Sequence, residues 1–352
     1  MGTRLREDIS ELVAARKALY STAGNMHWRE LAEQMAPSIQ LWAPQCWAEL
    51  QGMVQAGVPL EDLLLMCCDY EMQMESWANG GEMRCDPAAT PSGEEKYKVP
   101  EGTPAGRCTG FAVNGPRGSI LAQNVDEPLE GWDDGLRDIV LRHIDEKERE
   151  VLVYTHPGVP AYCGMNSSGL CVANFYIEDS SRGKGGVPID VILRELLKFD
   201  TIEQAVDWLE TIPRSLPTTC MLMQHQTIVC VEVTADRTVA VWVKGSNGRL
   251  CHANHPLLDQ TMQGSNTPNE SSLNRQQVMQ KSVHEAISAG GIDGAVAKEL
   301  LTKCPPVHPV YAPTIAAVVM EPAGQSGNMH VKFIGENKWL RASFTNNQTT
   351  DA

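Results

Sequence analysis

The switch from a polar linker to a β-strand at Cys108 constrains the fold of this chain most. Residues 84–107 are polar and rich in proline and glycine, so they predict an exposed connection without regular structure. Residues 108–113 then predict a strand, residues 114–118 a turn, and residues 119–125 the returning strand. A cysteine at this junction becomes a new N-terminus if the linker is cut before it. It then carries a thiol and a free α-amine on one residue, which is a nucleophile with its own base.

The first eighty residues predict helices. Leu5, Ile9 and Leu12 recur close to the helical period, and Pro59 suits the first turn of a helix over residues 60–77. Because Pro37 and Pro44 interrupt the stretch between these segments, we expect two or three helices there rather than one.

From Cys108 onward the pattern is mainly β, with short β-branched or alternating runs separated by turn signals. The expected helices are residues 187–199, 201–211 with a Thr-x-x-Gln capping box, 271–288 and 292–303. The expected strands after the hairpin are residues 151–155, 169–175, 220–224, 227–233, 238–243, 249–253, 314–321 and 330–334. Periodicity alone gives an α+β class, and this order suits two antiparallel sheets stacked face to face with helices outside.

Composition excludes several functional classes. A chain of 352 residues has ample core for one large or two ordinary domains. Its net charge of −15 and its lack of a basic run argue against nucleic acid and membrane-surface partners. No apolar stretch approaches eighteen residues, and the charged residues 1–10 do not resemble a signal peptide.

Cysteine usage predicts a reducing compartment. The eleven cysteines are an odd number without CxxC spacing. In a chain without a secretory signal such cysteines are expected to be reduced and mostly buried. We therefore expect a cytoplasmic protein.

Four segments of the sequence resemble one known family. They are Cys108-Thr109 with its return strand to Asp126; residues 163–170 (CGMNSSGL) followed by Asn174; residues 251–255 (CHANH); and residues 47–52 (WAELQG) followed by 61–66. Together they resemble the acyl-CoA:6-aminopenicillanic acid acyltransferase (isopenicillin N acyltransferase-like) family of Ntn hydrolases. The likeness extends from about residue 41 to residue 333.

The resemblance implies a fold and a set of site residues. The fold is a four-layer αββα sandwich of two stacked antiparallel sheets. Cys108 is the expected nucleophile, Asp126 holds its α-ammonium or orients its thiol, and Asn254 is an oxyanion donor. Weaker candidates for substrate or oxyanion binding are Thr109, Asn174 and Arg275, the last of which would bind a substrate carboxylate.

The resemblance also implies maturation of a zymogen by cleavage between Arg107 and Cys108. The expected parts are a helical pro-segment or α-subunit (residues 1–83), the linker (84–107), a catalytic β-subunit (108–345) and a disordered tail (346–352). The released fragment would remain as the partner in a heterodimer. The residue before the nucleophile is arginine here and glycine in the penicillin enzyme, so a trypsin-like protease is an alternative to autocatalysis.

Ordinary structural roles compete with several of these assignments. Asp126 can be a turn residue, Asn254 can anchor a loop, and Arg275 can be a solvated helix arginine. His252 and His255 lie three residues apart at a strand end without further ligands of zinc-like spacing, so we expect no metal site. Residues 183–186 (GKGG) lack the GxxxxGK[ST] frame and predict a mobile loop rather than a phosphate site.

The sequence therefore predicts an Ntn-type cysteine enzyme that forms a thioester on Cys108. It would transfer an acyl group from a small-molecule donor to an amine or to water, in specialised metabolism. It would need no cofactor, with acyl-CoA as a candidate co-substrate. Two alternatives remain open: a strict hydrolase of linear amides, such as a β-alanyl or acyl-amine amidase, and a non-catalytic binding protein on the same fold.

Overall fold

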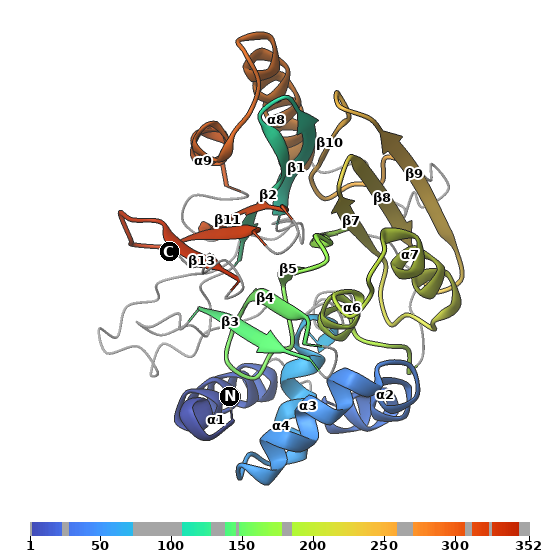
Figure 1. The fold of residues 1–352 in the computed structure, drawn as a ribbon. Helices are drawn as coiled ribbons and strands as arrows, with labels where there is room; N and C mark the ends of the chain where they lie inside the picture. The colour runs from blue at the N-terminus through green and yellow to red at the C-terminus, as the bar shows by residue number, and fades with distance from the viewer. Residues whose placement is uncertain are drawn as a thin grey trace, which may run out of the picture.

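Eight helices and two antiparallel sheets make up most of the part of the chain that the structure describes (Figure 1). The computed structural model describes residues 2–22, 28–72, 108–127, 138–145, 148–177, 185–258, 270–306, 312–323 and 326–344. Within these ranges, no helix is both long enough and apolar enough to cross a membrane.

The N-terminal helices are α1 (Gly2–Thr22), α2 (Trp28–Trp42), α3 (Pro44–Gln55) and α4 (Leu60–Cys67). Pro44 begins α3, where the missing N–H of proline costs no helical hydrogen bond. The prediction that Pro37 interrupts the helix was wrong, because α2 continues through it. The buried face of α2, which includes Met35 and Ile39, offsets the roughly 3 kcal/mol that an interior proline costs.

The first sheet carries the hairpin predicted at Cys108. Its strand order is β10-β1-β2-β11-β12-β13, and β1 pairs with β2 so that Cys108 lies opposite Val125. The strand bounds are β1 (Cys108–Gly115), β2 (Gly118–Asp126), β10 (Arg249–His252), β11 (Thr314–Glu321), β12 (Asn328–Phe333) and β13 (Leu340–Ser343). The hairpin and the strand over residues 314–321 are confirmed.

The second sheet is a meander of seven strands in sequence order, β3 to β9. The bounds are β3 (Ile139–Ile144), β4 (Glu150–Thr155), β5 (Cys163–Asn166), β6 (Cys171–Tyr176), β7 (Thr218–Gln224), β8 (Thr227–Val233) and β9 (Thr238–Lys244). The predicted strands in this region are confirmed to within a few residues. The edge strand β3 and the short strand β5 were not among the predicted strands, and neither was β13 at the edge of the first sheet.

The two sheets pack face to face, and the amide of Gln123 on β2 donates a hydrogen bond to the carbonyl of Asn174 on β6. Gly110 on β1 permits the close approach. A Cβ atom there would lie 2.3 Å from the carbonyl oxygen of Ala122 and 2.9 Å from the ring of Phe175 in the other sheet. A side chain at position 110 would therefore separate the sheets two residues from Cys108.

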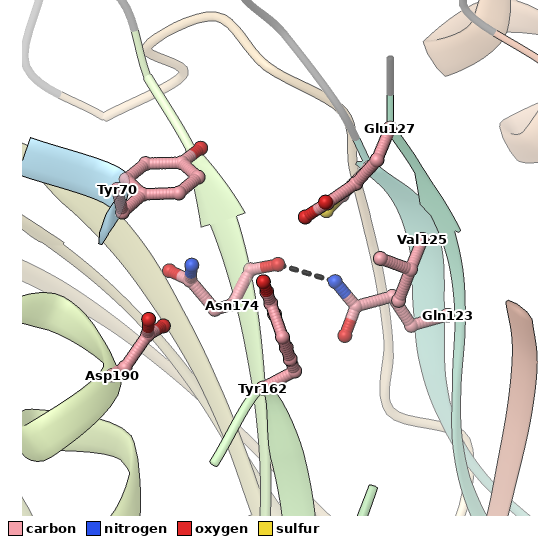
Figure 2. A pocket seen from close by; sticks show the side chains of 8 residues that line it. Tyr70, Gln123, Val125, Glu127, Tyr162, Asn174 and Asp190 are labelled. Carbon is pink, nitrogen blue, oxygen red and sulfur yellow. Dashed lines mark hydrogen bonds between the residues drawn. The ribbon is translucent and has the colours of Figure 1, made fainter. Parts of the chain in front are cut away.

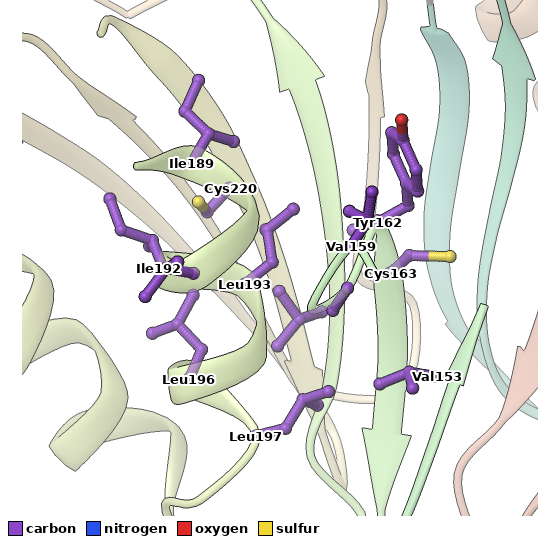
Figure 3. Close-up of a cluster of buried hydrophobic side chains, with 14 of the residues drawn as sticks. Val153, Val159, Tyr162, Cys163, Ile189, Ile192, Leu193, Leu196, Leu197 and Cys220 are labelled. Carbon is purple, nitrogen blue, oxygen red and sulfur yellow. The ribbon is translucent and has the colours of Figure 1, made fainter. Parts of the chain in front are cut away.

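Helices cover both outer faces, which confirms the four-layer αββα sandwich and the α+β class. On the first sheet, α8 (Glu270–Ser288) and α9 (Gly294–Lys303) bury Met279, Val283 and Leu301 against β1 and β11. On the second sheet lie α6 (Ile189–Leu196) and α7 (Ile202–Thr211), and Figure 3 shows Leu193 and Leu196 among the buried side chains there. Thr201 caps α7 as predicted, accepting from the backbone N–H of Gln204 at 3.3 Å.

The N-terminal helices are joined to α6 by buried polar contacts. The guanidinium of Arg194 pairs with Glu49 on α3, with Nε 3.1 Å from Oε2. The backbone N–H of Cys46 donates to Glu195 at 3.2 Å. Because Arg194 and Glu195 are both buried, losing a charged partner on α3 while the charge stays buried would cost several kcal/mol. The helical segment is therefore an integral part of the fold.

Glu71, just after α4, lies in the same region and should make stability depend on pH. Its Oε1 accepts from the N–H of Ile189 at 2.9 Å and from Ser215 Oγ at 2.6 Å, while Oε2 is buried without a hydrogen-bond partner. Burial raises the pKa of Glu71 from 4.5 to about 7, against the lowering effect of these two hydrogen bonds.

A raised carboxyl pKa means that the folded chain binds a proton that the unfolded chain has released. Stability contributed by Glu71 is therefore present below pH 4.5 and lost as pH rises to about 7, by about 3 kcal/mol. Glu71→Gln should remove most of this loss in the Cys108→Ala chain, as measured by urea unfolding at pH 5 and pH 8. Glu203→Gln, an exposed change on α7, is the matched control. An unchanged difference between the two pH values in Glu71→Gln would contradict the assignment.

Candidate active site

Cys108 lines a small pocket between the two sheets, and Figure 2 shows the other residues that line it. Its side chain is 7 % exposed. The pocket is also lined by Tyr70, Gln123, Val125, Glu127, Tyr162, Asn174 and Asp190. Tyr70 follows α4, so the N-terminal helical segment supplies part of the wall.

The backbone of Cys108 is held on both sides by polar side chains. Its N–H donates to Asn254 Oδ1 at 3.0 Å. Its carbonyl accepts from Arg275 Nη1 at 2.6 Å. The pairing of β1 with β10 brings Asn254 to this place, because Gly110 lies opposite His252 and the chain then turns at residue 253.

Asn254 belongs to the same network. Its Oδ1 also accepts from Arg275 Nη2 at 2.8 Å, and its Nδ2 donates to the carbonyl of Tyr176 at 2.9 Å. The N–H of Asn254 donates to Ser272 Oγ at 2.8 Å. An amide group has two N–H hydrogens, so one remains for an oxyanion beside Cys108. The loop-anchoring contacts and the oxyanion role are therefore compatible, and the oxyanion role stays a prediction.

Asp126 ends β2 beside the nucleophile, since Cys108 pairs with the preceding residue, Val125. The carboxylate is fully buried and accepts from Thr314 Oγ1 at 2.6 Å. Asp126 is thus part of a strand, and the explanation of it as a turn residue is wrong. It lies close enough to raise the pKa of the Cys108 thiol.

The thiol of Cys108 is neutral in the uncut chain. Burial raises its pKa from 9.0 to about 12, the negative charge of Asp126 adds to this rise, and Gln123 and Arg275 oppose it. In the uncut chain the nitrogen of Cys108 is an amide and carries no positive charge. Cleavage would place an ammonium group beside the sulfur, which favours the thiolate.

Arg275 extends from α8 into the site and is 1 % exposed. The explanation of it as a solvated helix arginine is wrong. Besides Cys108 and Asn254 it contacts Thr109, whose Oγ1 accepts from Nη1 at 2.5 Å. These contacts hold the backbone of Cys108 and the side chain of Thr109, whereas binding of a substrate carboxylate by Arg275 stays a prediction.

Asn174 lies on β6 and lines the pocket. Its Oδ1 accepts from the hydroxyl of Thr218, and its carbonyl accepts from Gln123. The structure thus brings Cys108, Thr109 and Asp126 together with the distant residues Asn174, Asn254 and Arg275.

Other predicted features lie elsewhere or outside the described residues. Arg107, the linker 84–107 and the tail 346–352 are outside them, as are residues 183 and 184. Of the ten described cysteines, all are free thiols and nine are buried. His252 contacts Glu232 at 3.3 Å and His255 contacts Ser272 at 2.8 Å, and the described ranges hold no cluster of three or more candidate metal ligands.

Sequence reasoning missed six of the eight pocket residues: Tyr70, Gln123, Val125, Glu127, Tyr162 and Asp190. Gln123, Val125 and Glu127 lie close to the predicted site residue Asp126 in the sequence, and this was the one available signal. The other three come from three separate segments, and no local pattern marks them as neighbours of Cys108.

A comparison with known protein families gives a match over more than half of the chain. The family model described as acyl-coenzyme A:6-aminopenicillanic acid acyl-transferase matches residues 113–328. This range includes Asp126, Asn254 and Arg275, and Cys108 precedes it. A comparison with curated proteins found no match.

Two solved structures are similar to part of the chain, both at 14% identity and a TM-score of 0.48. One is penicillin V acylase from Agrobacterium tumefaciens, with 68% of this chain and 86% of that one covered. The other is a mutant of conjugated bile acid hydrolase from Clostridium perfringens, with 70% of this chain and 94% of that one covered.

Proposed function

Because the chain belongs to the acyl-coenzyme A:6-aminopenicillanic acid acyl-transferase family, we propose that it is a self-processing enzyme whose nucleophile is the N-terminal thiol of Cys108. The observation that carries this proposal is the fixed backbone of Cys108 at the pocket. Asn254 accepts its N–H, Arg275 donates to its carbonyl, and Asp126 lies beside its thiol.

Maturation is the first reaction in this proposal. The sulfur of Cys108 attacks the carbonyl carbon of Arg107, and the bond from that carbon to the nitrogen of Cys108 breaks as the nitrogen gains a proton. The product is a thioester, which water hydrolyses. Residues 1–107 then end in a carboxylate, and Cys108 carries a free α-amine.

Turnover uses the same sulfur. The α-amine takes the thiol proton as the sulfur attacks the carbonyl of an acyl donor, and the leaving group departs with that proton. The acyl group is then bonded to Cys108 as a thioester. Water yields a free acid and an amine acceptor yields an amide, and either one regenerates the thiol. The donor is a small molecule such as an acyl-CoA or an amide, and no cofactor takes part.

The cut fragments are expected to stay together as a heterodimer. The contacts of Glu49 with Arg194 and of Cys46 with Glu195 join α3 to α6 across the future cleavage site. Tyr70 in the pocket wall supports a continuing role of residues 1–107 in the mature enzyme.

The ratio of amide to free acid formed from the acyl-enzyme distinguishes a transferase from a hydrolase. Cleaved protein incubated with a panel of acyl thioesters should gain one acyl mass, localised by peptide mass spectrometry to Cys108. Increasing concentrations of amines should then divert product from free acid to amide in proportion to amine. Free acid alone at saturating amine would favour the linear-amide hydrolase. Absence of any acyl mass on Cys108 in protein shown to be cleaved would overturn the enzymatic proposal and favour the binding protein.

A further inference from the structure

The pocket beside Cys108 is lined by two acidic side chains and two aromatic rings. Glu127 and Asp190 are both 2 % exposed and both line it. Figure 2 shows their carboxylates on opposite sides of the pocket, with Asn174 between them and the rings of Tyr70 and Tyr162 on either side of that space. Glu127 follows β2 in the first sheet, whereas Asp190 lies in the first turn of α6.

One carboxylate oxygen in this wall lacks a partner. Glu127 Oε2 is buried and makes no hydrogen bond within the described residues. A buried anion without a partner costs several kcal/mol, which an opposite charge or a hydrogen-bond donor can offset. A ligand group with positive charge and N–H donors would offset this cost.

Other carboxyl groups lie close to this wall. Burial raises the pKa of Asp190 well above 3.8, and the nearby carboxylates of Glu71, Asp69 and Glu127 raise it further. This shift favours the protonated form of Asp190, and a cation bound in the pocket would favour its ionised form. Arg16 is a cation in this region, and it pairs with Asp69 at 3.0 Å. Among the described residues, no salt bridge involves Glu71, Glu127 or Asp190.

The rings favour the same kind of ligand. The face of a tyrosine attracts a cation within about 6 Å. Tyr70 packs edge-on against Tyr176 with ring centroids 5.3 Å apart, and Tyr162 packs edge-on against His156 at 4.7 Å. These contacts fix both rings, so they form walls of constant shape on two sides of the pocket.

We propose that this pocket binds an ammonium group carried by the substrate, close to the carbonyl that Cys108 attacks. The inference rests on the proposed function, and it narrows the substrate class to compounds with a primary or substituted amine on the acyl chain or on the amine that accepts it. An ammonium group offers up to three N–H donors to Glu127 and Asp190 and a positive charge to the two rings.

The test uses pairs of substrates in which a methyl group replaces the ammonium group. On the acyl side, N-acetylcysteamine thioesters of β-alanine and of butanoic acid have nearly the same shape. On the amine side, 1,3-diaminopropane and butylamine compete for enzyme already loaded with a butanoyl group. We expect kcat/KM for the ammonium compound to exceed that of its partner by about 30-fold in one of the two arms. A preference among the thioesters would place the ammonium group on the acyl chain, and a preference among the amines would place it on the acceptor.

Two substitutions connect the preference to the pocket. Glu127→Gln and Asp190→Asn keep the shape of each side chain and remove its charge. Each should reduce the ammonium-to-methyl ratio by about tenfold or more, whereas the exposed change Glu203→Gln should not alter it. The ratio is the informative quantity, because any effect of Glu127 on the reactivity of Cys108 acts equally on both compounds of a pair.

Failure of this inference can be distinguished from failure of the proposed function. If Cys108 is acylated but neither arm prefers the ammonium compound, the inference is wrong and the proposed function stands. A second result would also overturn the inference: Glu127→Gln matures more slowly, and the wild-type protein does not prefer the ammonium compounds. Glu127 would then be the partner of the α-ammonium group of Cys108 rather than of a substrate. If no donor acylates Cys108, calorimetric titration with β-alaninamide and butanamide still tests the pocket, and equal affinities would contradict the inference.

Discussion

Cys108→Ala should remain a single chain of 352 residues, whereas the wild-type protein should resolve into two chains on a denaturing gel. N-terminal sequencing of the larger wild-type chain should begin Cys-Thr-Gly-Phe. Both the cleavage and the acyl transfer require the sulfur of Cys108, so we expect activity to fall to background in the variant. The buried thiol Cys163 lies in the second sheet, and Cys163→Ala provides a matched control that should still be cut.

Arg107→Gln distinguishes autocatalysis from an external protease. An attack by Cys108 on the preceding carbonyl needs no particular side chain at position 107, so this variant should still mature. A trypsin-like protease needs the arginine. Loss of cleavage in Arg107→Gln together with normal cleavage in Cys108→Ala would therefore rule out the autocatalytic route.

Asn254→Ala should lower the turnover of an acyl donor by about 10²–10³, or roughly 3–4 kcal/mol of transition-state stabilisation. The reason is the second Nδ2 hydrogen, which the hydrogen bond to Tyr176 leaves free to donate to an oxyanion. Single-turnover rates on cleaved protein are the measurement, and a thermal unfolding curve of the same sample separates lost catalysis from lost folding.

Asn254→Asp tests which end of the side chain matters. It keeps the oxygen that accepts from Cys108 and Arg275, but it replaces the donating NH₂ with a second oxygen. If the amide stabilises an oxyanion, the aspartate variant should be impaired at least as strongly as the alanine variant. Near-wild-type turnover in both would return Asn254 to the role of a loop anchor.

The part of the site that the sequence predicted best is the part made by one hairpin. A strand, a turn and a return strand fix the relation of Cys108 to Asp126, because both lie within one pairing register. Asn254 and Arg275 were proposed by resemblance alone. Their position depends on the pairing of β10 with β1 and on the packing of α8 over that pair, and no local pattern encodes either.

The predictions that failed in the fold have physical causes. The strand β3 is an edge strand whose side chains are mostly half-buried or exposed, so it lacks the alternation that marks a strand with one buried face. The strand β13 has only four residues at the opposite edge. Pro37 was misjudged because the tertiary packing of α2 outweighs the local cost of proline.

The position of Tyr70 has a consequence for how the mature protein would behave on dilution. The wall of the pocket would be shared between two polypeptides once the linker is cut, with the tyrosine on the shorter one. Substrate preference would then depend on the equilibrium between joined and separated polypeptides. A preparation assayed far below the dissociation constant of the two chains would lose selectivity together with activity, and adding the shorter chain in excess would restore both.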